Sequence, residues 1–190
     1  MVNAAKERSR EIARKLRAEH ARDPAPPDTL APLLADRPEL RAAKTVALYI
    51  PCHGEPDTVA LCAYCHETGK TVAVPAWNPT TRAYSFYELR RGATLIESRF
   101  GVREPAEKIP VATETIDLFL APGLLFDVSG CRLGHGKGFY DRLLAPRRPD
   151  APVWGIAFDW QISHTSLPND PHDIRMDALC VGQAFLPVTI

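Results

Sequence analysis

Short apolar stretches alternate with polar segments along most of the chain, and their periodicities predict the elements. Runs rich in β-branched, aromatic and leucine residues that end at a turn predict strands. Such runs lie at 45–50, 72–75, 84–89, 116–122, 153–158, 178–181 and 184–188. Apolar residues spaced three or four apart predict helices. These helices are expected at 3–22, at 29–42 with a break near Pro38, at 57–68 and at 138–144.

Strands that alternate with helices are typical of α/β proteins. We therefore predict one Rossmann-like, three-layer domain over residues 1–190, with a parallel or mixed sheet and helices on both faces. Between 90 and 115 the pattern carries few signals, so we expect irregular chain there. The proline-rich stretch at 24–27 is the one segment with the composition of a linker.

Composition and charge limit the class of partner. The chain is 45% hydrophobic and 24% charged, which is ordinary for a globular protein. Its 23 Lys and Arg residues balance 23 Asp and Glu residues. This balance argues against a dedicated binder of nucleic acid or of anionic membranes. The segment 3–22 is an exception, with seven basic residues against three glutamates, and it fits either a solvated helix face or a site for a phosphorylated ligand.

The apolar runs and the cysteines bear on where in the cell the protein is expected. The longest uncharged apolar run, 118–126, is too short to span a bilayer, which takes about 18 residues. No secretory signal is visible near the start, and the five cysteines are then expected to be free thiols. We expect a cytoplasmic monomer that binds small molecules, with neither a nucleic acid nor a membrane as partner.

The segment 130–142 carries the strongest chemical signal. Glycines alternate at 134, 136 and 138, immediately before a predicted helix. Glycine allows successive backbone N–H groups to turn toward one anion, and Arg132 and Lys137 add positive charge. These features favour a phosphate-binding loop over the alternative, a glycine-rich turn that only reverses the chain.

Two familiar nucleotide motifs do not describe this loop. The P-loop has Ser or Thr after its lysine, whereas Gly138 follows Lys137. The dinucleotide fingerprint would have glycine where Phe139 stands. The loop is therefore a phosphate-binding candidate of a different kind.

Cys62, Cys65 and His66 match the C-x-x-C-H pattern of haem attachment. Haem attachment takes place after export, and a zinc site would need two further ligands with suitable spacing. The sequence shows no export signal, and no two further zinc ligands stand nearby with suitable spacing. A redox site would have its first cysteine at a helix start, where the pKa of the thiol falls, and Cys62 is not at a helix start. We favour a packing role within the helix 57–68.

Together these residues resemble the 5-formyltetrahydrofolate cyclo-ligase family, also called 5,10-methenyltetrahydrofolate synthetases. The strongest match is PGLLFDVSGCRLGHGKGFYDRLL at 122–144. Weaker matches follow the family's order: the basic helix around 6–10, YIPCHGEPDT at 49–58, VREP at 102–105, IDLFLAPG at 116–123 and LPNDPHDIRMDALC at 167–180. The similarity covers nearly the whole chain.

The resemblance implies an ATP- and Mg²⁺-dependent reaction on 5-formyltetrahydrofolate. ATP phosphorylates the formyl oxygen, N10 attacks the activated carbon, and loss of phosphate leaves the 5,10-methenyl product and ADP. Such chemistry depends on positioning and charge neutralisation, which basic residues around a phosphate loop can supply.

The resemblance also implies the site residues. The ATP site would comprise Lys6, Arg10, Arg132, Leu133, Gly134, His135, Gly136, Lys137, Gly138, Phe139 and Tyr140, with Lys137 and Arg132 as the catalytic residues. The folate site would comprise Ile50, Glu55, His135, Gly136, Lys137, Gly138 and Phe139. Magnesium would be held by Asp141 and Asp173.

Physical alternatives remain for three of these residues. Glu55 matches the acid that accepts N–H bonds from the pterin, but an acid near a helix start is also favoured by the helix dipole. Ile50 fits a core strand equally well. Asp173 has close competitors in Asp170 and Asp177, although a carboxylate pair is what Mg²⁺ prefers.

The sequence departs from the family pattern at three places. Ala76 and Trp77 follow Pro75 where many relatives carry arginine, Tyr84 stands where many carry methionine, and Phe139 replaces a tyrosine. These changes indicate a reshaped folate pocket and leave open how the glutamate tail is held. The changed region 76–86 is the only support for one alternative, an ATP-dependent enzyme for another formyl or acyl substrate. A second alternative is a non-catalytic folate- or nucleotide-binding protein, but the intact set of Lys137, Asp141 and Asp173 argues against it.

Overall fold

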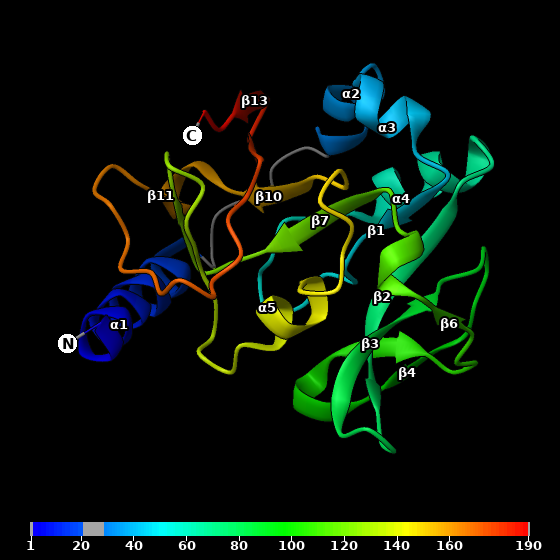
Figure 1. Ribbon diagram of the computed structural model, residues 1–190, viewed down its shortest axis with the longest axis horizontal. Coiled ribbons are helices and arrows are strands. Elements are labelled where there is room, and N and C mark those ends of the chain that lie inside the picture. Colours follow the sequence, from blue (N-terminus) through cyan, green and yellow to red (C-terminus); the bar gives the residue numbers. More distant parts are fainter. Residues whose placement is uncertain (1, 21–28, 190) are drawn as a thin grey trace.

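The computed structural model describes residues 2–20 and 29–189 (Figure 1). An eight-stranded mixed sheet forms its centre, with the strand order β13-β12-β10-β7-β1-β2-β3-β6. The five strands from β12 to β2 in that order are parallel, whereas β13, β3 and β6 pair antiparallel with their neighbours. The strands are β1 (Thr45–Ala47), β2 (Thr71–Asn78), β3 (Ala83–Glu88), β6 (Pro110–Val111), β7 (Leu118–Pro122), β10 (Val153–Ala157), β12 (Ala178–Val181) and β13 (Ala184–Pro187).

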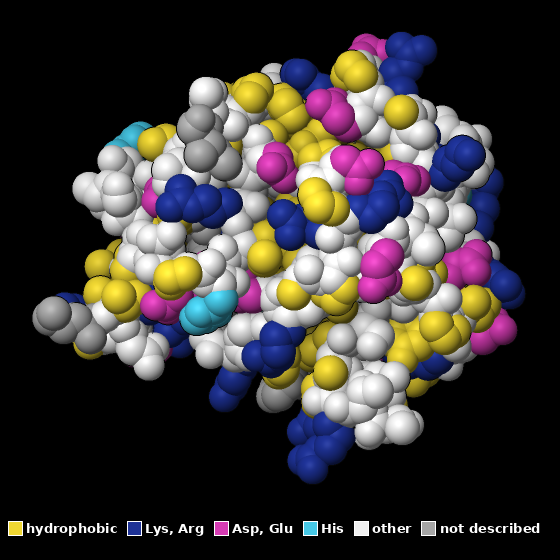
Figure 2. Space-filling view, viewed as in Figure 1, with side chains coloured by type: hydrophobic (Ala, Val, Ile, Leu, Met, Phe, Trp, Pro, Cys, Tyr) yellow, Lys and Arg dark blue, Asp and Glu magenta, His cyan; other side chains and the backbone are white. Residues whose placement is uncertain are grey.

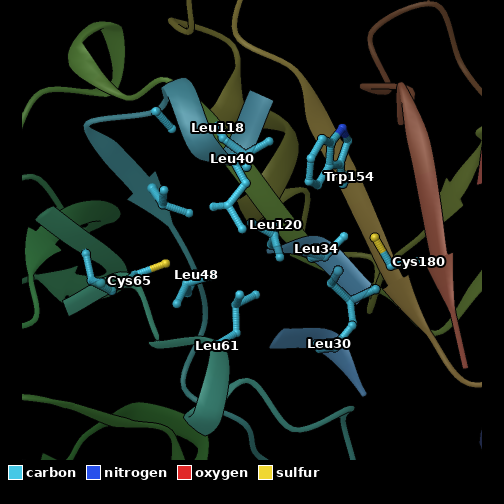
Figure 3. Packing of buried hydrophobic residues seen from close by; sticks show 14 of the residues in the cluster. Leu30, Leu34, Leu40, Leu48, Leu61, Cys65, Leu118, Leu120, Trp154 and Cys180 are labelled. Carbon is cyan, nitrogen blue, oxygen red and sulfur yellow. The ribbon is translucent and has the colours of Figure 1, made fainter. Parts of the chain in front are cut away.

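Helices cover both faces of this sheet because both side-chain directions of its central strands are apolar. On one face, side chains such as Leu48 and Leu120 pack against Leu34 and Leu61 from the helices (Figure 3). The helices on this face are α2 (Leu30–Leu34), α3 (Pro38–Ala42) and α4 (Val59–Glu67). On the other face, alternate positions such as Phe119 pack against α5 (Phe139–Leu144). The predicted three-layer α/β arrangement is confirmed.

The first helix packs on a separate small sheet. This sheet has the order β11-β8-β9, made of β11 (Ile162–Ser163), β8 (Leu125–Asp127) and β9 (Arg132–Leu133). Helix α1 (Val2–His20) buries Ala13, and half-buries Leu16, in a cluster with apolar residues of β8 and β9. Since the charged residues of α1 flank this contact, the helix brings its basic side chains to the chain that leaves β7.

The expected irregular stretch at 90–115 is wrong in part. It contains β4 (Leu95–Glu97) and β5 (Arg103–Pro105), which pair antiparallel, the 3₁₀ turns η1 (Arg99–Gly101) and η2 (Thr113–Thr115), and β6. The two strands of the hairpin are three residues long and half exposed, with Ile96 48% exposed. Such strands lack the buried apolar run on which the expectation relied.

Other boundaries differ by a few residues. The expected helix at 29–42 is two short helices, and Pro38 begins the second, where its fixed φ suits the first turn. The strand expected at 45–50 leaves the ladder after Ala47. The end of the predicted helix 3–22 and the proline-rich stretch 24–27 lie outside the described residues.

A buried carboxylate joins the glycine-rich loop to the segment after β11. Asp127 is 1% exposed and accepts hydrogen bonds from the N–H groups of Ser129, Cys131 and Leu167 and from the Ser129 hydroxyl. Burial raises the pKa of this carboxyl, but the hydrogen bonds outweigh burial and hold the pKa below its usual value. Asp127 therefore fixes two segments that line the candidate site.

None of the described helices combines the length and the apolar character that a membrane span requires.

Candidate functional site

Two adjoining cavities lie where the parallel strands β1, β2 and β7 end. In open α/β sheets, ligands bind in the crevice beyond the carboxyl ends of such strands. One cavity, of about 450 Å³, is walled mostly by apolar side chains and is called the apolar cavity. The other, of about 290 Å³, is walled by the glycine-rich loop, α1 and acidic residues, and is called the charged cavity. Both are lined by Glu55, Pro122, His135, Lys137, Phe139 and Tyr140.

Glu55 places a carboxylate in the wall between the cavities. Its Oε2 accepts a hydrogen bond from the Cys52 N–H at 3.2 Å and lies 3.5 Å from the Cys52 thiol sulfur. Burial raises the pKa of Glu55, although the hydrogen bonds from Cys52 and the nearby charge of Arg17 act in the opposite direction. This carboxylate can accept N–H bonds from a heterocycle in the apolar cavity.

The glycine-rich loop is shaped by two residues in the left-handed region. Gly136 has φ +89° and Gly138 has φ +60°, values that side-chain-bearing residues rarely adopt. A Cβ at Gly136 would lie 2.9 Å from Cζ of Arg10, whose Nε donates to the Gly134 carbonyl at 3.0 Å. Glycine at 136 thus permits the first helix to lay a guanidinium across the loop.

Lys6 occupies the acidic side of the charged cavity. Its ammonium donates to Asp170 at 2.7 Å and also to Asp173. Burial lowers the pKa of Lys6, but the two carboxylates outweigh burial and raise it above its ordinary value. Burial raises the pKa of Asp173, whereas the bonds from Lys6 and the Asp170 N–H bring the net value below normal. Lys6 is thus the resident counter-ion of this acidic pair.

Arg132 and Asp141 form a further ion pair in the charged cavity. Nη2 of Arg132 lies 3.0 Å from Oδ1 of Asp141, and the arginine side chain is 5% exposed. The same carboxylate oxygen accepts the Ile174 N–H at 3.3 Å. The buried Nε of Arg132 has no acceptor among the described residues, which suits an anionic ligand.

The acidic residues expected to hold magnesium line the same cavity. Asp141 and Asp173 both line this cavity. Potential ligand atoms of Asp170, His172 and Asp173, one from each side chain, lie within 4.8 Å of one another. Of the two competitors of Asp173, Asp170 joins the cavity, whereas the Asp177 carboxylate accepts the Val153 N–H at 2.7 Å beside the sheet. Oxygen ligands of this kind fit Mg²⁺, which keeps several waters and phosphate oxygens in its shell.

The other predicted residues divide between the cavities. Ile50, Glu55, His135, Lys137 and Phe139 line the apolar cavity. The charged cavity is lined by Lys6, Arg10 and the loop residues 132–140. Gly136 and Gly138, expected in both sites, belong only to the lining of the charged cavity.

Sequence reasoning missed Arg17 and Arg103. Arg17 of α1 donates to the carbonyl oxygens of His53 at 3.3 Å and Gly123 at 3.1 Å. Arg17 follows Lys6 by eleven residues and Arg10 by seven, which puts all three on one helix face, and this spacing is a signal that could have found it. Arg103 lines the apolar cavity from β5; it lies in the family match at 102–105, but that match gave it no role.

The C-x-x-C-H segment packs as expected. Cys65 is fully buried in the core, and Nε2 of His66 lies 2.7 Å from the Leu89 carbonyl oxygen. Among the described residues, the one group of three potential metal ligands is Asp170, His172 and Asp173, which includes no residue of this segment.

The three departures from the family pattern meet on one wall. Trp77 of β2 faces Tyr84 of β3 across the ladder, with ring centroids 5.5 Å apart. Tyr84 in turn contacts Phe139, with centroids 5.0 Å apart. The departures therefore change one continuous surface beside the apolar cavity.

Comparison with known proteins places this chain in a family. A sequence model of the 5-formyltetrahydrofolate cyclo-ligase family matches residues 3–182. A 5-formyltetrahydrofolate cyclo-ligase of Mycolicibacterium smegmatis is 35% identical over 144 residues, which are 71% of this chain and 72% of the relative. The enzyme of that name from Haemophilus influenzae is 32% identical over 76% of this chain and 79% of its own length.

A solved structure agrees. The NMR structure of Aquifex aeolicus 5,10-methenyltetrahydrofolate synthetase superposes with a TM-score of 0.70 at 31% identity, over 96% of this chain and 84% of that one. A 5,10-methenyltetrahydrofolate synthetase from Mycoplasma pneumoniae shares the fold, with a TM-score of 0.67 at 24% identity, over 95% and 97% of the two chains.

Proposed function

The chain belongs to the 5-formyltetrahydrofolate cyclo-ligase family, and we propose that it cyclises 5-formyltetrahydrofolate to 5,10-methenyltetrahydrofolate at the expense of ATP. One observation carries the proposal beyond the family name. An apolar cavity with one carboxylate adjoins a cavity rich in cations, and Lys137 lines both. This arrangement suits a ring substrate whose reacting oxygen must meet a phosphoryl group.

The formyl oxygen is a poor leaving group, so the reaction needs to activate it. The formyl oxygen attacks the γ-phosphorus of ATP, and the bond to ADP breaks. N10 then attacks the formyl carbon and loses its proton, and the C–O bond breaks to release phosphate. In this scheme Lys137, Arg10 and Arg132 stabilise the charge on the phosphoryl oxygens, and the glycine-rich loop supplies N–H donors.

Glu55 has the complementary role in the apolar cavity. Its carboxylate accepts N–H groups of the pterin and so orients the ring, with the formyl group toward Lys137. Apolar side chains such as Ile50 and Phe139 contact the ring faces. Positioning of this kind converts an encounter between two bound substrates into a reaction within one complex.

We further propose that Mg²⁺ accompanies ATP at Asp173, Asp170 and Asp141. When bound, Mg²⁺ neutralises phosphate charge, which is its usual contribution to phosphoryl transfer. The chain's own contribution is the set of carboxylates that line the charged cavity beside the glycine-rich loop.

The setting is proposed to be the cytoplasm, with the protein as a monomer. All five cysteines are free thiols, which suits a reducing compartment. Residues of a single chain line both cavities, so a second copy is not needed to complete them. Basic and acidic side chains are interspersed on the face in Figure 2, unlike the continuous basic surface of a nucleic-acid binder.

The test is a single assay. Purified protein is mixed with 5-formyltetrahydrofolate, ATP and Mg²⁺, and the near-ultraviolet absorbance of the methenyl product is followed beside ADP release. We expect both signals to rise together and to need ATP and Mg²⁺. ATP binding with no product would overturn the proposal and favour another formyl or acyl substrate.

A further inference from the structure

A row of aromatic side chains leads away from the wall that the two cavities share. Phe139 belongs to that wall, Tyr84 contacts Phe139, and Trp77 contacts Tyr84. The guanidinium of Arg99 lies over the Trp77 ring, 4.6 Å from its centroid. The row therefore ends on a cation.

The lining of the cavities gives this row a direction. Glu55, Lys137 and Phe139 line both cavities, whereas Tyr84 and Arg103 line only the apolar one. Arg103 therefore belongs to a part of the apolar cavity that the charged cavity and its glycine-rich loop do not share. A long ligand with its reacting group at Lys137 can extend along this part to Arg103.

The hairpin that carries Arg103 is fastened to the main sheet. Glu104, the next residue, is 2% exposed and accepts the Trp77 N–H at 2.9 Å and the Lys108 ammonium at 2.7 Å. A turn of the same hairpin lies against the loop that precedes Glu55, since a Cβ at Gly101 would be 3.4 Å from Cε1 of His53. The strand is therefore held in place while the Arg103 side chain stays exposed.

We propose that Arg103, with Arg99 beyond it, binds the glutamyl carboxylates of the reduced folate. Trp77 and Tyr84 form the surface along which the aminobenzoyl part lies. The inference rests on the proposed function, because it takes the identity of the substrate from there. Arginine suits carboxylate through paired N–H donors, and aromatic rings suit the neighbouring benzoyl ring.

A competing carboxylate sets the expected strength. Glu97 lies opposite Arg103 in the β4–β5 ladder, so the substrate tail must compete with it. Arg103 is also exposed, and exposed ion pairs are screened by salt. We therefore expect a contribution to substrate affinity of roughly tenfold, larger at low salt.

The experiment varies the tail and the arginine together. Steady-state rates are measured with 5-formyltetrahydrofolate, with its triglutamate and with 5-formyltetrahydropteroate, which lacks the glutamate. The variants are Arg103→Ala, Arg103→Lys and Arg99→Ala, and Arg91→Ala serves as the control because Arg91 is exposed and lines neither cavity. Thermal unfolding by circular dichroism verifies that each variant folds.

The expected result is a split between substrates. Arg103→Ala should raise KM for the monoglutamate roughly tenfold at unchanged kcat and leave the pteroate unaffected. Arg103→Lys keeps the charge but not the paired donors, so it should cause a smaller rise in KM than Arg103→Ala. Arg99→Ala should remove any gain from the added glutamates. An equal rise in KM for the pteroate, or no rise for the monoglutamate, would overturn the assignment.

A second readout separates this inference from the proposed function. Equilibrium binding of the same three compounds without ATP is followed by intrinsic tryptophan fluorescence. If no compound is turned over but the monoglutamate binds more tightly than the pteroate in an Arg103-dependent way, the proposed function fails and the tail site stands. Equal binding of all three compounds would overturn the tail site whatever the turnover.

Discussion

The two adjoining cavities share a wall but are held together by opposite means. The apolar cavity takes its shape from rings and aliphatic side chains packed at the ends of β1, β2 and β7, with Glu55 as its partly buried charge. The charged cavity is held by ion pairs that join distant segments, such as Lys6 with Asp170 and Arg132 with Asp141. The apolar cavity is therefore held in shape by side-chain packing. The charged cavity is held in shape by ion pairs whose partners a ligand can replace.

This difference has an energetic meaning. Burying a carboxylate without a cation costs stability, and a ligand that supplies N–H donors recovers part of that cost. In the charged cavity the ion pairs already offset the cost of burying their charges. A phosphorylated ligand must therefore compete with the carboxylates for the same basic side chains. The cavities should therefore respond differently to loss of a single charge.

The largest effect is expected at the shared wall. Lys137→Ala should lower kcat/KM by about 10²–10³, because it removes a cation from the developing phosphoryl charge. ATP-dependent formation of the methenyl product measures this loss. Lys15→Ala, on the exposed face of α1, is the matched control, and near-normal turnover of the Lys137 variant would remove this residue from the reaction.

Glu55→Gln should affect the binding of folate and not that of ATP, although Glu55 lines both cavities. The variant should weaken binding of the reduced folate by at least roughly tenfold, since charged hydrogen bonds contribute about 1.5–3 kcal/mol. ATP affinity should be unchanged. Equilibrium titrations with each ligand give the two values, and a loss confined to ATP would place Glu55 in the wrong cavity.

The same substitution predicts a pH dependence of stability. Burial raises the pKa of Glu55, so the folded state binds its proton more tightly than the unfolded state, whose pKa is near 4.5. Stability then falls as pH rises from 4.5 through the folded-state pKa, and stays lower above it. Glu55→Gln removes this cost, so its unfolding temperature should exceed that of the wild type more at pH 7 than at pH 4.

Lys6→Met should affect the charged cavity alone, with a smaller loss. We expect KM for ATP to rise roughly tenfold and folate affinity to stay constant, because one charge-assisted contact to phosphate is removed. Arg8→Ala is the control on the exposed side of the same helix. A change in folate binding equal to that for ATP would contradict the separation of the cavities.

The smallest effect is expected far from both cavities. Cys62→Ala should leave turnover unchanged and alter the free energy of unfolding by less than about 1 kcal/mol, because Cys62 is only partly buried beside the core. Turnover and thermal unfolding measure this. Loss of activity would revive a chemical role for the C-x-x-C-H segment.

The sequence predicts most strands of the central sheet well and the short strands outside it, those of the β4–β5 hairpin and of the β11-β8-β9 sheet, poorly. The central strands are continuous apolar runs because both faces of the sheet are covered, as at Leu118–Pro122. The hairpin β4–β5 is short and half exposed, so its residues carry no such pattern. The match to the family at 102–105 marks this segment, but its strand and the place of Arg103 at the apolar cavity were therefore not predicted.

The candidate site shows the same division. The glycine-rich loop is local, and the alternation of Gly134, Gly136 and Gly138 is enough to reveal it. The association of Lys6 with Asp170, and of Trp77 with Tyr84, depends on chain packing and strand register. Neither association follows from spacing along the chain. The charges and the aromatic residues could be recognised as candidates in the sequence, but which residue contacts which could not be predicted.

The pairing of Lys6 with Asp170 and Asp173 also bears on the order of folding. These contacts span 164 and 167 residues, so the charged cavity can be completed only after the segment 170–173 has joined the folded part of the chain. Contacts of such separation form late, because a long loop must close first. The strongly charged surface of α1 keeps that helix hydrated until Asp170 and Asp173 are in place, and only then is the charged cavity complete.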